Sequence, residues 1–507
     1  MQETRLSRQP AAEKAATAAA ISQKLDAPKA ASSAISQHAP SVGFVSLGCP
    51  KALVDSERIV TQLRAEGYQI SNQYEGADLV VVNTCGFIEQ AKKDSIDTLL
   101  AAADFKESGT TKAVVAVGCM AERYGAQLAE VLPEADAVLG FDDYADIADR
   151  LRSILAGGGH EAHVPRDRRK LLPIAPTDRQ RAAGRIVTPG HAPLPEGLAP
   201  ATGPRVIRRR LGSGPAAPLK IASGCDRRCA FCAIPAFRGS YLSRPVADII
   251  AEARWLVEQG VKEVLLVSEN TSSYGKDLPG VNLETLLPQL SRVDGLEWIR
   301  VSYLQPAEIR PGMLEVMFDT EKVVPYFDLS FQHAAPGVLR RMRRFGDPDS
   351  FLGLVERIRA VEPRAGIRSN VIAGFPGETE SDVETLREFI IDANLDFLRV
   401  FGYSDEEGTE GEGLDAHLDQ AEVDARRELL ADVANMVCES RAAERVGERT
   451  VVLVEETGAG GASGRAPHQG PETDGVVELP GADARIGQFI EVELIDVTGI
   501  DMVGEAR

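Results

Sequence analysis

The chain has 507 residues, and at roughly 150 residues per domain this length predicts about three domains. Its formal net charge of -20 at pH 7 argues against a surface that coats nucleic acid, because phosphate binding needs clustered Lys and Arg. The apolar runs fall far short of the roughly 20 residues that span a bilayer, and the amino terminus lacks a signal-peptide pattern. We therefore expect a cytoplasmic protein, in which closely spaced cysteines favour metal binding or catalysis over disulfides.

The first 40 residues and the region 41–155 differ in pattern. Residues 1–40 are rich in Ala, Ser and Gln and have no aromatic residue, which is typical of a mobile tail. Three strand-like apolar runs follow, and they end at Cys49, Cys85 and Cys119. The intervals of 36 and 34 residues suit one strand-helix-strand unit each. The pattern predicts a small parallel α/β domain over 41–155.

The three cysteines of this domain fall at the carboxyl ends of predicted parallel strands. Ligands bind at that edge in open α/β sheets, so three thiols there would converge on an iron-sulfur cluster with one iron uncoordinated. A single cysteine in such a place is more often a buried small hydrophobe. Position alone leaves both interpretations of Cys49, Cys85 and Cys119 open.

Between 156 and 217 the periodic pattern gives way to Pro, Gly and Arg. Residues 161–210 hold eleven Lys and Arg against four Asp and Glu, together with eight prolines. A stretch of this length without periodicity predicts a linker or a mobile loop. Its basic charge suits contact with RNA, although a solvated linker explains the charge as well.

From 218 to 440 strand-like runs alternate with helical patterns again, with a polar helical run toward the end. About six successive βα units with right-handed crossovers curl into a full or partial TIM-like barrel. Residues 446–507 show short strands separated by Gly and Pro, which predicts a small antiparallel β-barrel. The predicted fold class is α/β multidomain, with a small parallel amino-terminal domain, a TIM-like barrel and a carboxyl-terminal β-barrel.

The stretch GCDRRCAFC places Cys225, Cys229 and Cys232, which we call the radical triad, directly after the first predicted barrel strand. A structural zinc site normally has four ligands, and this loop has three thiols and no nearby His. Three thiolates suit three irons of a 4Fe-4S cluster and leave the fourth iron open to an outside ligand. A zinc site is the alternative that this spacing does not favour.

The Cys-x3-Cys-x2-Cys spacing, with Phe231 before the last cysteine, resembles the signature of the radical S-adenosylmethionine (SAM) enzymes. The runs 46–57, 81–97 and 116–125 look like the amino-terminal domain of the methylthiotransferases in that superfamily. The first of these runs is more similar to the RimO branch, which modifies a ribosomal protein, than to the transfer-RNA branch. The resemblance extends from about Ser41 to the end of the chain, interrupted by the predicted linker.

The resemblance implies two 4Fe-4S clusters and SAM. One cluster would sit on the radical triad, and the other on Cys49, Cys85 and Cys119, which we call the auxiliary triad. In the family the first cluster cleaves SAM to a 5'-deoxyadenosyl radical, and the second presents the sulfur that a further SAM methylates. A low-potential electron donor and a sulfur source are then also required. We expect no catalytic His or Asp, because the cofactors carry the chemistry.

Other stretches that match the family fall at predicted strand ends, where the family has its SAM and substrate pocket. Gly374 and Gly377 would allow the backbone to approach a ribose or adenine, and Glu378 would accept a hydrogen bond from a hydroxyl. Gln332 and His333 suit a pocket role and a satisfied pair in the core equally well.

Two observations depart from the family pattern. The family has Gln-Asp where Glu269 and Asn270 stand, which leaves the detailed substrate contact open. Cys438, in the polar helical run, matches neither triad and is predicted to be structural.

The terminal barrel resembles the TRAM domain, which helps to bind RNA in the transfer-RNA branch. Residues 448–507 hold four Arg and no Lys against twelve Asp and Glu, and Phe489 is the sole aromatic residue. Such a module would repel phosphate and attract a basic protein. Resemblance and charge together predict methylthiolation of an aspartate β-carbon in ribosomal protein S-twelve of the small subunit, with 464–475 as a candidate contact loop.

Two alternatives remain at this point. The basic stretch 161–210 favours a transfer-RNA adenosine methylthiotransferase, whereas the acidic terminal barrel argues against one. A non-catalytic iron-sulfur sensor or electron carrier would not need an open iron in both clusters or a barrel of pocket-lining strand ends.

Overall fold

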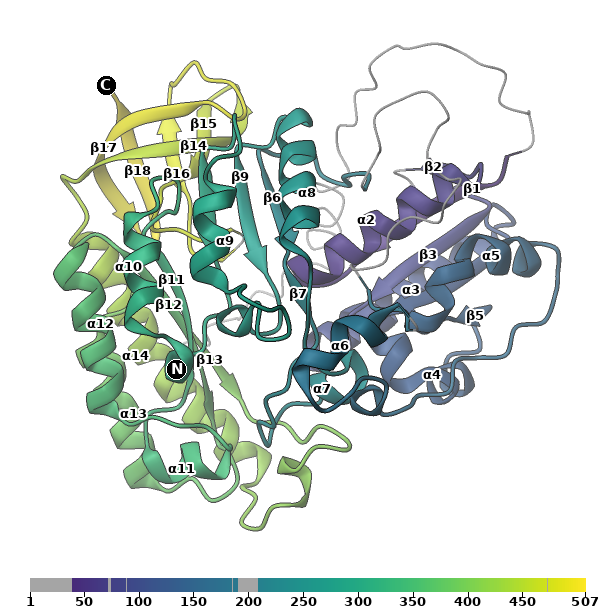
Figure 1. The fold of residues 1–507 in the computed structure, drawn as a ribbon, viewed down its shortest axis with the longest axis horizontal. Helices are drawn as coiled ribbons and strands as arrows, with labels where there is room; N and C mark the ends of the chain where they lie inside the picture. The colour runs from purple at the N-terminus through teal and green to yellow at the C-terminus, as the bar shows by residue number, and fades with distance from the viewer. Residues whose placement is uncertain (1–38, 72–73, 88, 185, 190–207, 472) are drawn as a thin grey trace, which may run out of the picture. The chain divides into compact units, whose positions relative to one another are not determined.

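The computed structural model describes residues 39–71, 74–87, 89–184, 186–189, 208–471 and 473–507. Nearly all of the predicted tail (1–40) and part of the predicted linker (190–207) lie outside these residues (Figure 1). Among the described residues, one compact unit comprises 39–48, 55–164 and 208–213, and a second comprises 49–54, 165–189 and 214–507. No helix in the described part of the chain is long and apolar enough to cross a membrane.

A five-stranded parallel sheet forms the centre of the first unit, in the order β2-β1-β3-β4-β5. The elements are β1 (Ser41–Ser46), α2 (Pro50–Ala65, of which residues 50–54 belong to the second unit), β2 (Gln69–Ser71), β3 (Leu79–Thr84), α3 (Glu89–Glu107), β4 (Ala113–Gly118), α4 (Cys119–Val131), β5 (Ala137–Val138), the 3-10 turn Phe141–Asp146 and α5 (Ile147–Leu155). Every residue of β3 and β4 is buried, as in a parallel sheet covered on both faces. The predicted parallel α/β domain is confirmed.

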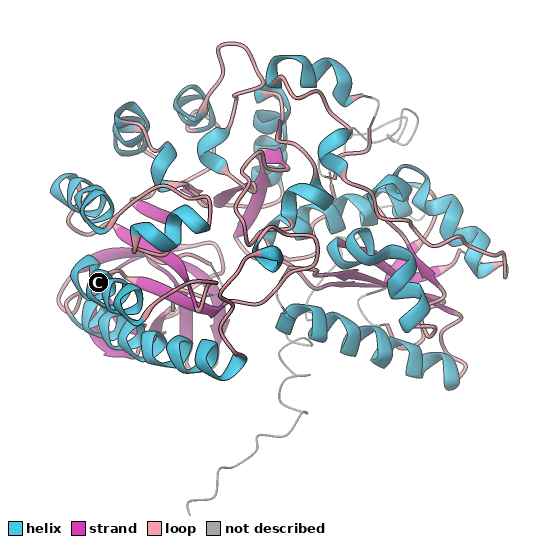
Figure 2. Ribbon diagram, turned by 90° about the horizontal axis from the view of Figure 1, so that it is seen from below, coloured by secondary structure: helices cyan, strands magenta, loops and turns pink. Residues whose placement is uncertain are grey.

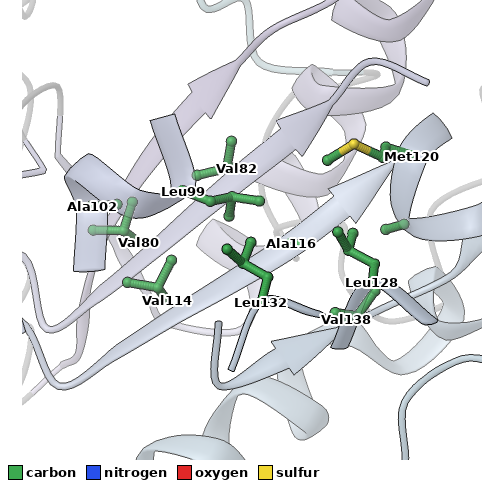
Figure 3. Packing of buried hydrophobic residues seen from close by; sticks show 11 residues of the cluster. Val80, Val82, Leu99, Ala102, Val114, Ala116, Met120, Leu128, Leu132 and Val138 are labelled. Atoms are coloured by element: carbon green, nitrogen blue, oxygen red, sulfur yellow. The ribbon is translucent and has the colours of Figure 1, made fainter. Parts of the chain in front are cut away.

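The core of this unit lies between β3, β4 and the helices α3 and α4 (Figure 3). Val80 and Val82 on β3 pair with Val114 and Ala116 on β4, and all four side chains join the same cluster because side chains alternate along a strand. Leu99 of α3 packs on them and is 1% exposed. Burying each large apolar side chain contributes about 1.5–3 kcal/mol. This packing holds β3 and β4 side by side, and a cysteine directly follows the end of each strand.

Six parallel strands of the second unit form a partial barrel. They lie in two sheets, with the orders β10-β9-β6 and β11-β12-β13. A parallel bridge between Leu304 and Leu329 joins the edges of the two sheets. The strands are β6 (Ala216–Lys220), β9 (Glu263–Val267), β10 (Trp298–Val301), β11 (Tyr326–Gln332), β12 (Gly366–Ala373) and β13 (Phe397–Gly402). The prediction of about six βα units in a TIM-like barrel is confirmed.

Helices cover the outside of these strands (Figure 2). The helices of this part of the unit are α7 (Ile234–Arg238), α8 (Val246–Glu258), α9 (Leu283–Leu290), α10 (Pro311–Asp319), α11 (Pro336–Arg341), α12 (Pro348–Val361), α13 (Glu380–Ala393) and α14 (Gln420–Ala443), and α7 lies beside the 3-10 turn Arg168–Lys170. The two-residue strands β7 (Ala222–Ser223) and β8 (Leu242–Ser243) pair antiparallel beyond the end of β6.

Part of the region predicted as a linker has regular structure. It contains the 3-10 turn Arg168–Lys170 and the helix α6 (Pro176–Ala183). Pro176 begins this helix, a position where its missing N–H costs no hydrogen bond. Sequence periodicity did not reveal α6, because a helix of eight residues, most of them polar, is too short to show an apolar face.

The last five strands form a closed barrel in the order β14-β15-β16-β18-β17, drawn in yellow in Figure 1. They are β14 (Arg449–Gly458), β15 (Gly461–Arg465), β16 (Val477–Pro480), β17 (Phe489–Thr498) and β18 (Asp501–Ala506). Buried side chains such as Val452, Val477 and Leu494 fill its interior. The predicted small β-barrel is confirmed, although its β16-β18 pair is parallel.

This barrel packs against the amino-terminal ends of the TIM-like strands. Glu263, the first residue of β9, forms an ion pair with Arg465 at 2.6 Å. Tyr326, the first residue of β11, donates a hydrogen bond to Asp474 at 2.7 Å. Most of 464–475 is therefore buried in this joint, and its contact with the substrate stays a prediction. The sequence could not show this, because the partners lie more than a hundred residues away in the chain.

Candidate functional site

The radical triad lies in the loop that follows β6 and the short strand β7. Gly224 has a φ of +78°, and a Cβ there would lie 2.4 Å from the Ser240 carbonyl oxygen, so only glycine fits this turn. The N–H of Cys225 donates to the carbonyl oxygen of Gly239 at 3.0 Å. The turn thus determines where the first thiol leaves the strand.

Further backbone hydrogen bonds hold the rest of this loop. The N–H of Cys232 donates to the carbonyl oxygen of Cys229 at 3.1 Å. Ala230, between them, donates to Met342 at 3.1 Å and accepts from Gly411 at 2.7 Å. Segments more than a hundred residues downstream therefore determine the conformation of the loop.

Sulfurs of the radical triad accept hydrogen bonds. The N–H of Arg227 donates to the Sγ of Cys225 at 3.4 Å, and Nη1 of Arg344 donates to the Sγ of Cys229 at 3.8 Å. Donors and a cation at the sulfurs are the contacts through which a protein tunes an iron-sulfur cluster. The loop therefore fits the cluster that the spacing predicts. Sequence reasoning missed Arg344, and its only signal was the arginine-rich stretch 340–344.

Burial affects the protonation of these thiols. It raises the pKa of the Cys225 thiol to about 12, and it also raises the pKa of Cys232. Both thiols are therefore protonated at neutral pH in the metal-free protein. Binding of iron must release these protons, because only a thiolate is a ligand.

The auxiliary triad follows three neighbouring strands in register. Asn83 of β3 pairs with Ser46 of β1 on one side and with Val117 of β4 on the other. Cys49, Cys85 and Cys119 come two or three residues after these paired positions. Each cysteine therefore follows the carboxyl end of one of three neighbouring strands, and the shared cluster that the sequence predicts on them stays a prediction.

Close packing at this edge is visible between the turns after β3 and β4. A Cβ on Gly86, next to Cys85, would lie 2.9 Å from the backbone nitrogen of Met120, next to Cys119. Nη1 of Arg123 donates to the carbonyl oxygen of Gly86 at 3.1 Å. The segments that carry Cys85 and Cys119 thus lie against each other.

Two auxiliary cysteines stand at helix starts. Cys119 is the first residue of α4, and the carbonyl oxygen of Cys49 accepts from the N–H of Ala52 at the start of α2 at 2.8 Å. The positive end of a helix stabilises a thiolate. Gly118, before Cys119, has a φ of +96°, and a Cβ there would lie 2.1 Å from Oδ1 of Asn83.

Both triads contain thiols only. Among the described residues, no three His, Cys, Asp or Glu side chains lie close enough to hold a single metal ion. A cluster makes a different demand, because each of three thiolates binds a different iron and the sulfurs stay farther apart than the ligands of one ion. Soft thiolate sets of this kind select iron-sulfur clusters over Mg²⁺ or Ca²⁺.

The predicted SAM-pocket residues form a turn after β12. Gly374 and Gly377 have φ values of +78° and +80°, which glycine adopts readily. Oε1 of Glu378 accepts from the N–H of Gly374 and from Nη1 of Arg426, each at 3.0 Å, and Oε2 lies 3.1 Å from Nε2 of His333. The Glu378 side chain is 0% exposed and holds the turn through these contacts, and its role toward SAM stays a prediction.

His333 has both ring nitrogens in contact, since its Nδ1 accepts from the N–H of Ala335 at 2.9 Å. Of the two roles considered for this residue, the structure shows the satisfied core residue. Gln332 has a φ of +72°, which bends the chain at the end of β11. Cys438 is buried in α14, in keeping with a structural role.

The two residues that depart from the family pattern differ in their contacts. Nδ2 of Asn270 donates to Oε2 of Glu308 at 2.9 Å. The Glu269 side chain is 2% exposed, accepts no hydrogen bond from the described residues and lies 3.8 Å from Nε of Arg238. Both residues follow β9 at the carboxyl end of the barrel, the end that also carries the radical triad.

Comparison with protein families and relatives gives consistent matches. Residues 41–140 match the uncharacterized protein family UPF0004, 219–390 match the radical SAM superfamily and 446–506 match the TRAM domain. The chain is 60% identical to the ribosomal protein uS12 methylthiotransferase RimO of Cutibacterium acnes, over 92% of this chain and 98% of that protein. It is 58% identical to the protein of the same name from Kineococcus radiotolerans, over 92% and 97%.

A solved structure shares the fold at low sequence identity. The radical SAM methyltransferase TsrM from Kitasatospora setae, with cobalamin and a 4Fe-4S cluster bound, aligns with a TM-score of 0.51 and 15% identity. The alignment covers 72% of this chain and 75% of that one.

Proposed function

The chain belongs to the RimO family of ribosomal protein uS12 methylthiotransferases, and from this premise we propose which residues carry each half of the reaction. The protein is a radical SAM enzyme that methylthiolates uS12 with SAM and two 4Fe-4S clusters. We assign one cluster to the radical triad and the other to the auxiliary triad. When bound, these groups supply the electron, the SAM-derived radical and the transferred sulfur.

The observation that carries this assignment is the placement of the two triads at strand ends. The radical triad occupies one hydrogen-bonded loop beyond β6, with Arg344 aimed at one of its sulfurs. The auxiliary triad occupies the carboxyl edge of β1, β3 and β4. Each set offers three thiolates, which leaves one iron of each cluster open to SAM or sulfur.

In this proposal the chain positions the reactants and carries no acid-base step. The turn that contains Gly374 and Gly377 lies at the same barrel end as the radical triad and forms part of the SAM pocket wall. Glu378 holds the shape of this turn through its bonds to Gly374 and Arg426. The pocket lining keeps water from the radical, which would otherwise be lost to side reactions.

We further propose that the acceptor is the β-carbon of an aspartate in uS12. The twelve acidic residues of 448–507 attract a basic protein substrate and repel the phosphates of RNA. Some of the arginines that make the stretch 161–210 basic are not available to bind RNA, because Arg168, Arg179 and Arg208 are buried. The reaction also needs a low-potential electron donor and a sulfur source.

The relatives do not favour the transfer-RNA alternative, since those named above are uS12 methylthiotransferases. A sensor or electron carrier has no support from them either.

An anaerobic assay with the reconstituted enzyme, SAM and a reductant tests the proposal. It offers uS12 and unmodified transfer RNA side by side and detects the product by mass spectrometry. We expect a methylthio mass gain on a uS12 aspartate that disappears in Cys49→Ala and in Cys225→Ala. A gain on RNA alone, or a gain that persists in either variant, contradicts the proposal.

A further inference from the structure

Residues 165–189, with residue 185 outside the described part, form a segment that we call the strap. It contains the 3-10 turn Arg168–Lys170 and α6, and it packs within the second unit. The strap lies in the stretch that the sequence predicted to be a linker. Its contacts concentrate on the segments that surround the radical triad.

Arg179 of α6 makes the central contact. Its side chain is 5% exposed, and Nη1 donates to Oδ2 of Asp226 at 2.6 Å and to the carbonyl oxygen of Tyr241 at 3.0 Å. The other guanidinium nitrogens donate to the strap itself, Nε to Pro173 and Nη2 to Ile174, each at 2.9 Å. One buried guanidinium therefore ties the strap to two points around Cys225.

Asp226 transmits this contact to the radical triad, because it is the residue directly after Cys225. Its Oδ1 accepts from the N–H of Tyr241 at 3.1 Å, and its Oδ2 also forms an ion pair with Lys276 at 2.8 Å. Cys225 itself is bonded to Gly239, two residues before Tyr241. The first thiol is therefore held between two contacts that depend on the same short segment, 239–241.

Further contacts fix the strap along its length. Nε2 of Gln180 donates to the carbonyl oxygen of Ser243 at 2.9 Å and to Oδ2 of Asp277 at 2.7 Å. Near the end of the strap, the carbonyl oxygen of Pro189 accepts from Nζ of Lys220 and from Oγ of Ser223, each at 3.0 Å. Lys220 ends β6 and Ser223 ends β7, so these two hydrogen bonds hold the strap against the residues that directly precede the triad.

We propose that the strap is a clasp for the radical cluster and that Arg179 is its positioning residue. The inference rests on the proposed function, because it takes the radical triad as the cluster ligands. By holding Asp226, Arg179 keeps the loop in one conformation before iron binds. Three sulfurs must meet three irons at once, so a preorganised loop binds the cluster more tightly and releases it more slowly.

The helix α6 offers a matched control. Arg181, two residues from Arg179, has a side chain that is 86% exposed, and its ion pair with Asp178 at 3.6 Å is a surface contact. Arg181→Met removes the same charge from the same helix without touching the triad. Arg179→Lys keeps the charge but cannot reach all of the acceptors that the guanidinium reaches, so it should restore the function in part.

Hydrogen exchange of the full-length, metal-free protein measures the loop without any need for activity. In Arg179→Met, we expect amides of 224–241 to exchange roughly tenfold faster or more, because a buried charge-assisted contact is lost. The same amides in Arg181→Met, and amides of 113–131 in either variant, should exchange as in the wild type.

The reconstituted enzyme supplies the second readout. Arg179→Met should lose the iron of the radical cluster to excess chelator roughly tenfold faster than Arg181→Met, with Arg179→Lys in between. If Arg179→Met exchanges and loses iron like Arg181→Met, the clasp does not exist. Should Arg179→Met fail to fold, Asp226→Asn, which keeps the side-chain shape and removes the charge, carries the same two predictions.

One further variant separates failure of this inference from failure of the proposed function. Cys225→Ala must lower the iron content if the radical triad holds a cluster. Lower iron in Cys225→Ala together with no effect of Arg179→Met overturns the clasp alone. Unchanged iron in Cys225→Ala overturns the cluster assignment, and the clasp with it.

Discussion

Both cysteine triads offer three thiols, but they differ in how the chain places these thiols. The radical triad spans eight residues of one loop, from Cys225 to Cys232, whereas the auxiliary triad is spread from Cys49 to Cys119. The loop owes its conformation to hydrogen bonds from distant segments, such as those with Met342 and Gly411. Each cysteine of the auxiliary set follows one of three adjacent strands that pair in register.

This contrast indicates where each site is vulnerable. A local loop depends on the hydrogen bonds that distant segments make with it, so substitutions far along the chain will disturb the radical triad. A sheet edge depends on the strands beneath it, and two of these strands, β3 and β4, are buried along their length in a packed core. Disturbing the auxiliary triad therefore requires a change in the turns or in the strand ends themselves.

Replacing single cysteines should have the largest effect and should separate the two triads by chemistry. Cys225→Ala abolishes both reductive cleavage of SAM and methylthiolation, because the radical cluster is lost. Cys119→Ala abolishes methylthiolation but retains SAM cleavage. Quantifying 5'-deoxyadenosine and methylthiolated uS12 in the same reaction checks both expectations. Loss of SAM cleavage in Cys119→Ala would contradict the assignment of SAM cleavage to the radical triad alone.

Glycine variants test the triads through their turns. Gly118→Ala places a methyl group 2.1 Å from Oδ1 of Asn83, and Gly224→Ala places one 2.4 Å from the Ser240 carbonyl oxygen. We expect each to lose the iron of its own triad and keep the other, with about 1–3 kcal/mol of backbone strain in addition. Iron analysis and denaturant unfolding measure the two effects.

The matched control for both is Gly109→Ala. Gly109 has a φ of +76°, close to that of Gly224, but nothing lies within 4 Å of its added Cβ. It should show the strain without any loss of iron. Equal iron loss in all three variants would mean that general destabilisation, rather than the local turn, releases the clusters.

Removing Arg344 should have a smaller effect, confined to the radical triad. Its guanidinium donates to the Sγ of Cys229, and a cation beside a sulfur favours the reduced cluster, which carries more negative charge. Arg344→Met should therefore shift the reduction potential to more negative values. A redox titration followed by electron paramagnetic resonance measures this shift, with Arg343→Met, an exposed neighbour paired with Glu410, as the control.

The smallest effect is expected at the edge of the sheet. The hydroxyl oxygen of Tyr144 accepts from the N–H of Gly118 at 2.9 Å, directly before Cys119. Tyr144→Phe leaves that buried N–H without this partner and should cost about 1 kcal/mol of unfolding free energy. Denaturant unfolding should detect this cost, while SAM cleavage stays at the wild-type rate.

The fold and both triads could be predicted from the sequence because their signals are periodic or local. The strand-like runs before Cys49, Cys85 and Cys119 have regular spacing, and the radical triad sits within a single short stretch. Parallel strands of one sheet end at one edge, so the placement of the auxiliary cysteines followed from the order of elements alone.

The side chains that hold the loop of the radical triad could not be predicted, because each makes its contact with a residue that is distant in the chain. Arg344 lies 115 residues from Cys229, and Arg179 lies 47 residues from Asp226. An acidic residue next to a cluster cysteine, such as Asp226, hints that a buried cation is needed, but not which one. The burial of most of 464–475 against β9 and β11 could not be predicted for the same reason.

The most direct test of the two-triad account is the iron content of anaerobically reconstituted protein. The account predicts about eight irons per chain in the wild type and about four when either Cys85 or Cys229 is changed to Ala. The double variant should hold none. A wild type with about four irons, or a single variant that still holds about eight, would contradict the assignment of one cluster to each triad.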